Sequence, residues 1–591
     1  MQMLREGESL GEAGKTKIIA IILVVIIIAG IGAGIYYYFA ARPKPLKLLL
    51  TYHAPNPDER KVAEILKATW TELGIDLETR GMEWDAQWEL AKADPLKAQD
   101  VFVFYWWPTI LSAYDYLFNM FHSEEEILFN LCYYNNSEFD ELIDEAFALE
   151  GVNRTKALEL YEEAQTILME DCPAICFYDQ KNIHIIRKGI KGYIDNPAYP
   201  HVVFWYELQP PTDTENDTFV EAWDSVIFTT CDPSESFSNE IIVMHSMYET
   251  LLRYLPNGTI VGVLATNWTV SEDGKTWTFW LRKGVKFHDG TPFNATAVKF
   301  SIERTIDMGM GAAFIWDSVD QIITFDDNPY KIQFKLKYPA PLDTIACSSY
   351  GAFIFSPSLA KIGNNTEIWQ WLNKDVFEGS PPYSYGTGPY YLYDWKPGEY
   401  AIFKKFDDYW GGWDDPHYEM IIVKYVAEPT TRKQGIIGGD YDFTLGLPLE
   451  ELDDVNASGV AVVVATPSYQ NLLGLLNTRK PPLDNKLVRQ ALAYATPYEQ
   501  IINEVMLGKY AVKSVGPVPR GIFGFSENIP QYEFNLTKAA ELLEQAGIKT
   551  PKSAAIVMAY IGSLIPCFLA IAFSPFSVRK RGVDEWDSEA I

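Results

Sequence analysis

Two long apolar runs stand near the ends of the chain, and a body of mixed periodicity separates them. Residues 18–41 contain no charged side chain, and at 1.5 Å per residue a helix of this length crosses a hydrocarbon core of roughly 30 Å. The run ends in Tyr36, Tyr37 and Tyr38, which is typical of an interfacial anchor and differs from the small-residue cleavage site of a signal peptide. We therefore expect a transmembrane helix over residues 18–41.

A second apolar run covers residues 554–576 and predicts another transmembrane helix, because Arg579, Lys580 and Arg581 follow it at once. Lys15 and Lys17 precede the first run, so the positive-inside rule predicts cytoplasmic tails at residues 1–17 and 577–591. The body between the runs is then extracellular, on the outer side of the cell membrane. Glycosylation sequons lie in that body and agree with this placement, at Asn135, Asn153, Asn216, Asn257, Asn267, Asn294, Asn364, Asn456 and Asn535.

The body alternates helical and extended patterns, which predicts a mixed α/β class. Apolar positions recur with helical spacing over residues 59–73, 138–149, 154–170 and 538–546, whereas residues 46–51 and 276–281 are rich in strand-forming side chains. A polar linker at 209–218 (QPPTDTENDT) divides the body. With 591 residues, the chain exceeds what one hydrophobic core usually supports, so we expect at least two lobes.

Charge and cysteine spacing exclude several classes of function. The chain carries 79 acidic and 49 basic residues, a net charge of -30, and no basic stripe, so nucleic acid is not expected as a partner. No cysteine spacing is typical of a zinc site, and we expect neither a metal nor a cofactor. The sequence leaves open whether the first five of the six cysteines form disulfides outside the cell. They are Cys132, Cys172, Cys176, Cys231, Cys347 and Cys567.

The larger part of the body carries a dense set of motifs. It begins with YETLL at 248–252, LATNW at 264–268, DGKTW at 273–277 and LRKGVKFHDGTPFNATAVKFSIER at 281–304. The last segment predicts a strand, a turn at Asp289-Gly290, and a helix that begins after Asn294 or Thr296 as its cap. Four further motifs follow: GTGPY at 386–390, YWGG at 409–412, PLDNKLVRQAL at 482–492 and NLTKAAELLEQAG at 535–547.

As a set, these motifs resemble the dipeptide/oligopeptide-binding family of ABC-transporter solute-binding proteins, called family 5. The resemblance breaks off at Ile548, and the C-terminal third of the family pattern is found instead at residues 46–208. Residues 219–548 match the N-terminal two thirds, and the linker 209–218 joins the two parts. The resemblance therefore implies a circularly permuted chain. A gene-assembly artefact is the alternative explanation of this order.

The family resemblance implies an α/β, two-lobed periplasmic-binding-protein-like fold of type II, in which hinge closure encloses the ligand. By family order, lobe one covers about residues 181–465, and lobe two covers about 46–180 together with 466–548. Both membrane helices would leave the body from one place, so we expect Ala41 and Ala554 to be neighbours.

The segment 104–118 (FYWWPTILSAYDYLF) corresponds to the family segment that holds the ligand's amino group. Peptide-binding members carry an aspartate at the position of Thr109, which offers a hydrogen bond but no charge. Trp106 and Trp107 offer faces that suit sugar rings, so an oligopeptide and an oligosaccharide both remain as ligands. Asp115 is a candidate to replace the missing charge. Family position adds five further candidate ligand-binding residues: Tyr385, Thr387, Tyr469, Gln470 and Asn471.

Together these inferences predict a membrane-anchored solute-binding protein that passes a small ligand to an ABC permease and is not an enzyme. No GxSxG, HExxH or P-loop motif occurs. A glycoside hydrolase that uses paired carboxylates is the enzymatic alternative. A surface receptor or sensor without a transport role is the other, although the two predicted tails leave no room for a signalling domain. Uncleaved anchors combined with sequons favour an archaeal host.

Overall fold

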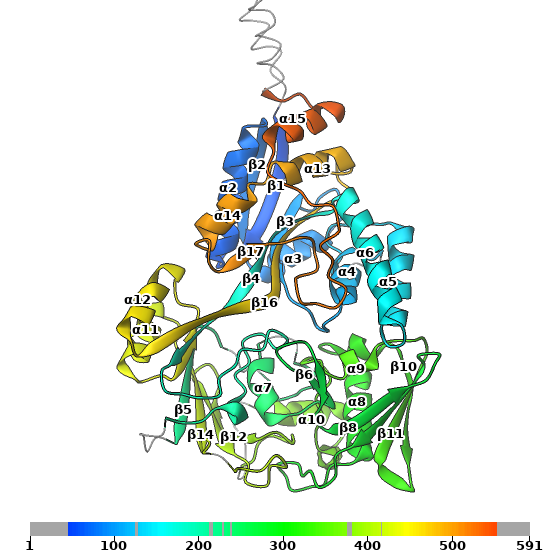
Figure 1. Cartoon of the computed structure of the whole chain (residues 1–591), viewed down its shortest axis with the longest axis vertical. Helices are drawn as coiled ribbons and strands as arrows, with labels where there is room; N and C mark the ends of the chain where they lie inside the picture. The colour runs from blue at the N-terminus through cyan, green and yellow to red at the C-terminus, as the bar shows by residue number, and fades with distance from the viewer. Residues whose placement is uncertain are drawn as a thin grey trace, which may run out of the picture.

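Two lobes, one above the other in Figure 1, are joined by a pair of long strands. This computed structural model describes residues 45–123, 128–211, 217–226, 230–236, 239–374, 381–414 and 416–551. The membrane helices predicted at 18–41 and 554–576, and the tails beyond them, lie outside the described residues. Within the described ranges, no helix combines the length and apolar character that crossing a membrane requires.

Lobe two, the upper lobe of Figure 1, takes its elements from both ends of the described chain. Its strands are β1 (Leu46–His53), β2 (Ile75–Met82), β3 (Val101–Trp106) and β17 (Ala511–Lys513). Its helices are α2 (Pro57–Thr71), α3 (Trp84–Lys92), α4 (Ala113–Phe121), α5 (Ser137–Glu150), α6 (Arg154–Asp171), α13 (Lys486–Tyr494), α14 (Tyr498–Val505) and α15 (Leu536–Gln545). An early and a late part of the sequence therefore share one lobe.

Strand β3 shows why lobe two forms a layered α/β structure. Alternate side chains of a strand point to opposite faces, and both faces of β3 are buried. Val101 and Val103 belong to the core that includes α2, whereas Phe102 and Phe104 belong to the core that includes α4, α5 and α6. Since β1 lies parallel to both β2 and β3, helices cover both faces of this part of the sheet.

Lobe one is the lower lobe of Figure 1 and has its own core. Its strands of the large sheet are β5 (Thr218–Trp223), β12 (Tyr390–Lys396), β13 (Tyr400–Lys405), β14 (Met420–Tyr425) and β15 (Phe443–Leu445). A separate sheet has the order β10 (Val319–Phe325), β11 (Asn328–Leu336), β9 (Thr276–Leu281) and β8 (Ala265–Val270), and β6 (Leu252–Tyr254) pairs with β7 (Ile260–Gly262). The helical segments are α7 (Ile241–Met247), α8 (Ala295–Met308), α9 (Leu342–Ile345), α10 (Asn365–Leu372), α11 (Pro429–Gly438), α12 (Leu452–Ser458), η1 (Trp205–Glu207), η2 (Ala313–Trp316), η3 (Pro357–Lys361) and η4 (Leu449–Glu451).

Several sequons also serve as helix caps. The predicted start of α8 is confirmed, because the Asn294 side chain accepts the N–H groups of Thr296 at 2.9 Å and Ala297 at 3.4 Å. Asn153, Asn364 and Asn535 cap α6, α10 and α15 in the same way. An Asn cap contributes about 1 kcal/mol to a helix, so these four sequons have a structural reason to exist. Glycosylation stays a prediction.

The two joining strands, β4 (Ala174–Arg187) and β16 (Ala461–Leu476), form one antiparallel pair within the eleven-stranded sheet. Near one end they pair with β3 and β17 of lobe two, and near the other β4 pairs with β15 of lobe one. A buried polar cluster links them, since Asp195 accepts hydrogen bonds from Asn182 of β4, at 3.1 Å, and from the Thr466 hydroxyl of β16. The register shifts between Pro467 and Asn471, so β16 carries a bulge between the lobes.

The two ends of the described body meet at the top of lobe two in Figure 1. Leu46, at the start of β1, pairs with Ile75 of β2. A Cβ atom built on the preceding residue, Gly74, would lie only 2.9 Å from Cδ of Pro551. Residues 46 and 551 are therefore near neighbours. Ala41 and Ala554 themselves lie outside the described residues.

All five cysteines of the described body are buried free thiols. They are Cys132, Cys172, Cys176, Cys231 and Cys347. Burial raises the pKa of the Cys132 thiol to about 12, which keeps it protonated and unreactive at neutral pH. The disulfides that the sequence left open are therefore not formed among these residues.

Candidate functional site

A cavity of about 620 Å³ lies between the lobes, and both lobes contribute to its wall. Lobe two supplies Arg154 and Leu158 of α6, Leu111 of the loop before α4, and the segment 521–525. Lobe one supplies the β6–β7 hairpin, including Tyr254 and Asn257, and Asp343 of α9. Tyr469 comes from the bulge of β16. A cavity of this size, with apolar walls and a few polar groups, suits a small ligand.

The cavity contains opposite charges on opposite lobes. Arg154 is the first residue of α6, and its guanidinium carbon lies 4.1 Å from the ring centre of Phe523. Asp343 is half-buried on α9, and one of its carboxylate oxygens accepts the N–H of Thr344 at 2.9 Å. Burial raises the pKa of Asp343, while the Thr344 N–H and the Arg154 guanidinium lower it in part. Within the described body, neither side chain forms an ion pair.

Tyr469 is the one predicted ligand-binding residue that lines this cavity. It is 6% exposed, and its carbonyl accepts a hydrogen bond of 2.5 Å from the Tyr116 hydroxyl, which fixes the backbone of the bulge. Its ring passes so close to Gly521 that a Cβ atom there would lie 2.8 Å from Tyr469 Cε1. Gly521 also has φ of +97°, which other residues rarely adopt. A glycine at 521 therefore shapes this wall.

Two of the predicted ligand-binding residues, Trp107 and Thr109, follow β3 and contact lobe one. Trp107 donates its indole N–H to the Tyr350 hydroxyl of lobe one at 3.1 Å, and its ring meets His201 edge-on. The Thr109 carbonyl accepts a hydrogen bond of 2.8 Å from the Ser348 hydroxyl, also of lobe one. The space beside Thr109 and Ser348 is only about 10 Å³. In this conformation Trp107 and Thr109 hold the lobes together and leave little room for a ligand.

Trp106 and Asp115 support this loop from inside lobe two. The Trp106 ring packs edge-on against Phe104 and Phe129. Asp115 is 3% exposed, and its Oδ1 accepts the N–H groups of Thr109 at 3.1 Å and Ile110 at 3.3 Å. Burial raises the pKa of Asp115 to about 7, and these N–H groups limit the rise. Asp115 thus organises the loop and does not line the large cavity as a substitute charge.

The remaining four predicted residues lie outside the wall of the large cavity. Asn471 is fully buried and donates to the Pro517 carbonyl at 2.7 Å, while the Gln470 N–H donates to the Ser468 hydroxyl at 3.2 Å. The Tyr385 hydroxyl accepts from the Trp371 indole at 3.2 Å. Thr387 is fully buried in lobe one. These contacts are local, and they position the chain around the hinge and inside lobe one.

Three of the sequence motifs meet at one buried carboxylate, that of Glu249 in YETLL. It accepts hydrogen bonds from Thr387 of GTGPY at 2.8 Å, and from Tyr409 at 3.0 Å and Trp410 at 2.8 Å, both of YWGG. Burial raises the pKa of Glu249 to about 7, and the three donors offset part of that rise. Gly386 allows this convergence, because a Cβ atom there would lie 2.0 Å from the Met247 carbonyl. The motifs therefore build the interior of lobe one.

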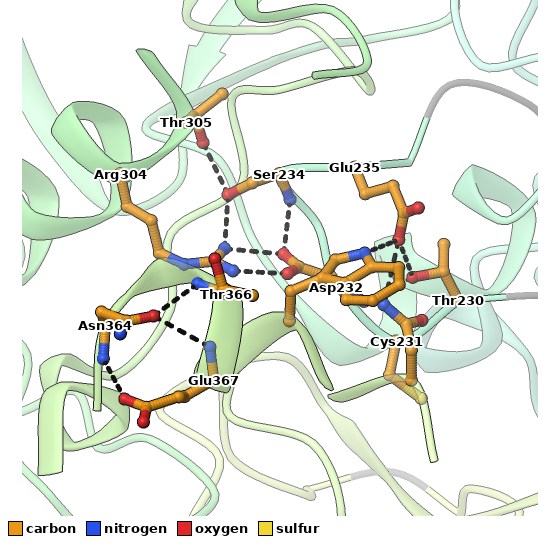
Figure 2. Close-up of polar contacts among 12 residues, drawn as sticks. Thr230, Cys231, Asp232, Ser234, Glu235, Arg304, Thr305, Asn364, Thr366 and Glu367 are labelled. Carbon is orange, nitrogen blue, oxygen red and sulfur yellow. Dashed lines mark hydrogen bonds and ion pairs between the residues drawn. The ribbon is translucent and has the colours of Figure 1, made fainter. Parts of the chain in front are cut away.

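A second polar cluster of lobe one is drawn in Figure 2, where the Arg304 guanidinium faces the Asp232 carboxylate. Two parallel hydrogen bonds, of 2.7 and 2.5 Å, join them, and their side chains are 1% and 0% exposed. Ser234 donates its backbone N–H to Asp232 at 3.0 Å, and its hydroxyl accepts from Arg304 at 2.8 Å. This ion pair closes on itself inside the lobe and offers nothing to a ligand.

Sequence reasoning missed the two charges of the cavity, Arg154 and Asp343, and the aromatic segment 521–525. Arg154 opens a helix in the sequence and has the pattern of an ordinary surface position. The segment 521–525 (GIFGF) carried a usable signal, because two glycines alternate with aromatic residues between predicted elements. Their meeting depends on the packing of the lobes, which the sequence pattern does not give.

Comparison with known proteins matches this chain to a family model and to several relatives. The family model of bacterial extracellular solute-binding proteins, family 5, middle region, matches residues 29–126 and 259–564. The probable D,D-dipeptide-binding periplasmic protein DdpA of Escherichia coli (strain K12) is 29% identical over 316 residues, which are 52% of this chain and 59% of DdpA. The glutathione-binding protein GsiB of Pectobacterium atrosepticum is 31% identical over 326 residues, 54% of this chain and 59% of GsiB.

Solved structures give similar but weaker matches. The periplasmic binding protein DppA from Helicobacter pylori, in complex with the peptide STSA, has 26% identity and a TM-score of 0.45, covering 58% of this chain and 71% of DppA. NikZ from Campylobacter jejuni, in complex with Ni(L-His), has 23% identity and a TM-score of 0.45, covering 56% and 64%. This chain spans less than two thirds of the length of DdpA and GsiB. Because the family model covers more than half of the sequence, the chain belongs to the bacterial extracellular solute-binding proteins, family 5.

Proposed function

We propose that this protein is the extracytoplasmic solute-binding component of an ABC importer and binds an oligopeptide between its lobes. The observation that carries the proposal is the interlobe cavity of about 620 Å³, lined from both sides of the strand pair β4 and β16. A strand pair that joins two lobes can act as their hinge, and a ligand that contacts both lobes favours closure of the lobes. The name of DdpA refers to D,D-dipeptides, and the name of GsiB refers to glutathione.

The cavity also bears on the enzymatic alternative. A glycoside hydrolase needs two carboxyl groups about 5 to 10 Å apart across the scissile bond. Asp343 is the only acidic residue among the described residues that line the cavity. The buried carboxylates of Glu249 and Asp115 accept hydrogen bonds from donors within their own lobe. This arrangement supports binding without a chemical step.

Circular permutation and double membrane anchoring are part of the same proposal. The proximity of residues 46 and 551 supports the permutation, because opening a loop of the unpermuted chain would leave its two new ends side by side. In the proposed order, residues 46–208 and 219–548 exchange places relative to the family pattern. Predicted helices 18–41 and 554–576 would then anchor lobe two at one point, with the body outside the cell.

Calorimetric titration of the full-length chain, purified in detergent micelles, tests the ligand class. Candidate ligands are di- to hexapeptides and β- and α-linked oligosaccharides, and we expect a peptide to bind with micromolar or better affinity. If only an oligosaccharide binds, the ligand is a sugar and the peptide in the proposal is wrong. Failure of every ligand to bind a folded chain would argue against a transport role. Crosslinking in host membranes then separates an importer, which captures a permease, from a receptor.

A further inference from the structure

The two charged groups that line the interlobe cavity, the exposed Arg154 and the half-buried Asp343, form no ion pair within the described residues. Arg154 stacks on Phe523, which leaves the edge of its guanidinium, where the N–H donors are, available to a ligand. One carboxylate oxygen of Asp343 accepts a hydrogen bond from the N–H of the adjacent Thr344, and Asp343 lines the cavity from lobe one. Within the described residues, no cation lies close enough to Asp343 to form an ion pair with it.

Removing a carboxylate from water is costly unless a cation or several donors replace the water. Asp343 is half-buried and has one donor, so a cationic group brought to it gains more than the same group gains in bulk water. A neutral ligand that fills the cavity would bury Asp343 further without bringing a cationic partner to it. The cavity therefore discriminates by charge as well as by shape.

We propose that Arg154 and Asp343 are the two charge anchors of the interlobe site, so that its ligand is a zwitterion whose anionic group binds Arg154 and whose cationic group binds Asp343. The proposal rests on interlobe binding as the protein's function and adds the class and direction of the ligand. For a peptide, the α-amino group lies at lobe one and the carboxylate at lobe two. Asp343 then supplies, from the opposite lobe, the charge that Thr109 lacks.

The aromatic walls fit a ligand held at both ends. Tyr469, Phe523 and Phe525 line lobe two and the hinge, and Tyr254 lines lobe one. Between them a short apolar stretch of ligand is enclosed, while its ends reach opposite charges. Because the anchors belong to different lobes, such a ligand links the lobes, and its binding favours the closed state.

The test uses the full-length chain and four forms of one probe, trialanine: with free ends, N-acetylated, C-amidated, and blocked at both ends. Calorimetric titration should show the free form binding roughly tenfold or more tightly than either singly blocked form, as expected for a charge-assisted contact. Asp343→Asn should remove the discrimination against N-acetylation and keep that against amidation. Arg154→Gln should do the reverse. Matched controls, Asp327→Asn and Arg60→Gln at exposed positions, should change neither.

Three results would overturn the anchors. If blocked and free trialanine bind equally, the ends are not read by charge, although interlobe peptide binding stands. If trialanine and a tripeptide library with free ends fail to bind while a neutral oligosaccharide binds, the zwitterion is wrong and solute binding stands. Failure of all these probes would overturn both the anchors and the proposed function.

Discussion

Two aspartate–arginine arrangements in this molecule have opposite designs. Asp232 and Arg304 lie within lobe one, join through two hydrogen bonds of 2.7 and 2.5 Å, and are almost completely buried (Figure 2). Asp343 and Arg154 belong to different lobes, face one cavity and form no ion pair in the described body. The closed pair uses its charge to fix the interior of a lobe. The open pair keeps its charge available, which is what a binding site requires.

The largest expected effect comes from breaking the closed pair. Arg304→Met leaves the Asp232 carboxylate buried without its partner, and we expect the free energy of unfolding of lobe one to fall by about 3–5 kcal/mol. Denaturant unfolding of the full chain measures this. Arg80→Met is the control, because Arg80 pairs with Glu78 at the exposed surface and should cost less than about 1 kcal/mol. Equal losses would remove the distinction between closed and exposed pairs.

A buried carboxylate without any cation should show a pH dependence that the closed pair does not. Burial raises the pKa of Glu59 to about 8, against 4.5 for the free side chain, and the His53 N–H opposes the rise. The protonated form is therefore favoured by folding. Its stabilising contribution is complete below pH 4.5 and is lost as the pH rises through 8.

Glu59→Gln tests this, since an amide keeps an acceptor for the His53 N–H but does not ionise. Each pKa unit corresponds to about 1.4 kcal/mol, so we expect the drop in stability between pH 5 and pH 9 to shrink by about 1–3 kcal/mol. Melting temperatures at several pH values measure it. Buried histidines act in the opposite direction, because burial lowers the pKa of His184 and His245 to about 3. An unchanged pH profile would show that Glu59 remains ionised in the folded chain.

A smaller effect is expected for the uncharged contact between the lobes, in which Trp107 donates a hydrogen bond to Tyr350. Trp107→Phe removes the hydrogen bond from the indole to Tyr350, worth about 0.5–1.5 kcal/mol, and should shift the ligand-free chain toward open conformations. Distances between spin labels at Glu64 of lobe two and Asp327 of lobe one, in a Cys567→Ser background, report the shift. Trp84→Phe, at a residue that is 41% exposed, is the control. Equal distance distributions in the two variants would exclude a role for this contact.

The smallest change in stability is expected when the Asp343 charge of the open pair is removed. Asp343→Asn removes a partly desolvated charge that forms no ion pair within the described residues, so we expect the free energy of unfolding to change by less than about 0.5 kcal/mol. Denaturant unfolding without ligand measures it beside Arg304→Met. A loss as large as that of Arg304→Met would make Asp343 a structural residue and weaken its assignment to the ligand.

Local patterns predicted local structure well. Residues 154–170 were expected to be helical, and α6 is Arg154–Asp171; residues 276–281 were expected to be extended, and β9 is Thr276–Leu281. Such elements follow from periodicity and caps that lie within the segment. The two-lobed class followed from family motifs, and those motifs in fact surround Glu249 inside lobe one.

The site was less predictable, because it depends on contacts between distant segments. Tyr469, one of the candidates from family position, lines the cavity from the bulge of β16, and its role in ligand binding stays a prediction. Asp115 and Thr387 are polar residues near the motifs, but their hydrogen bonds go to neighbours within their own lobe, to the Thr109 N–H and to the Glu249 carboxylate. Arg154 lies in α6 and Asp343 lies in α9, so the two residues are far apart in the sequence. Only the packing of the lobes brings them to one cavity.

The proximity of residues 46 and 551, at the two ends of the described body, has a mechanical consequence. A load applied through residues 46 and 551 acts between neighbouring points on one lobe, where β1 is held by β2 on one side and β3 on the other. The path of that force does not cross β4 and β16. A load applied at residues 46 and 551 is therefore not transmitted across the strand pair that joins the lobes.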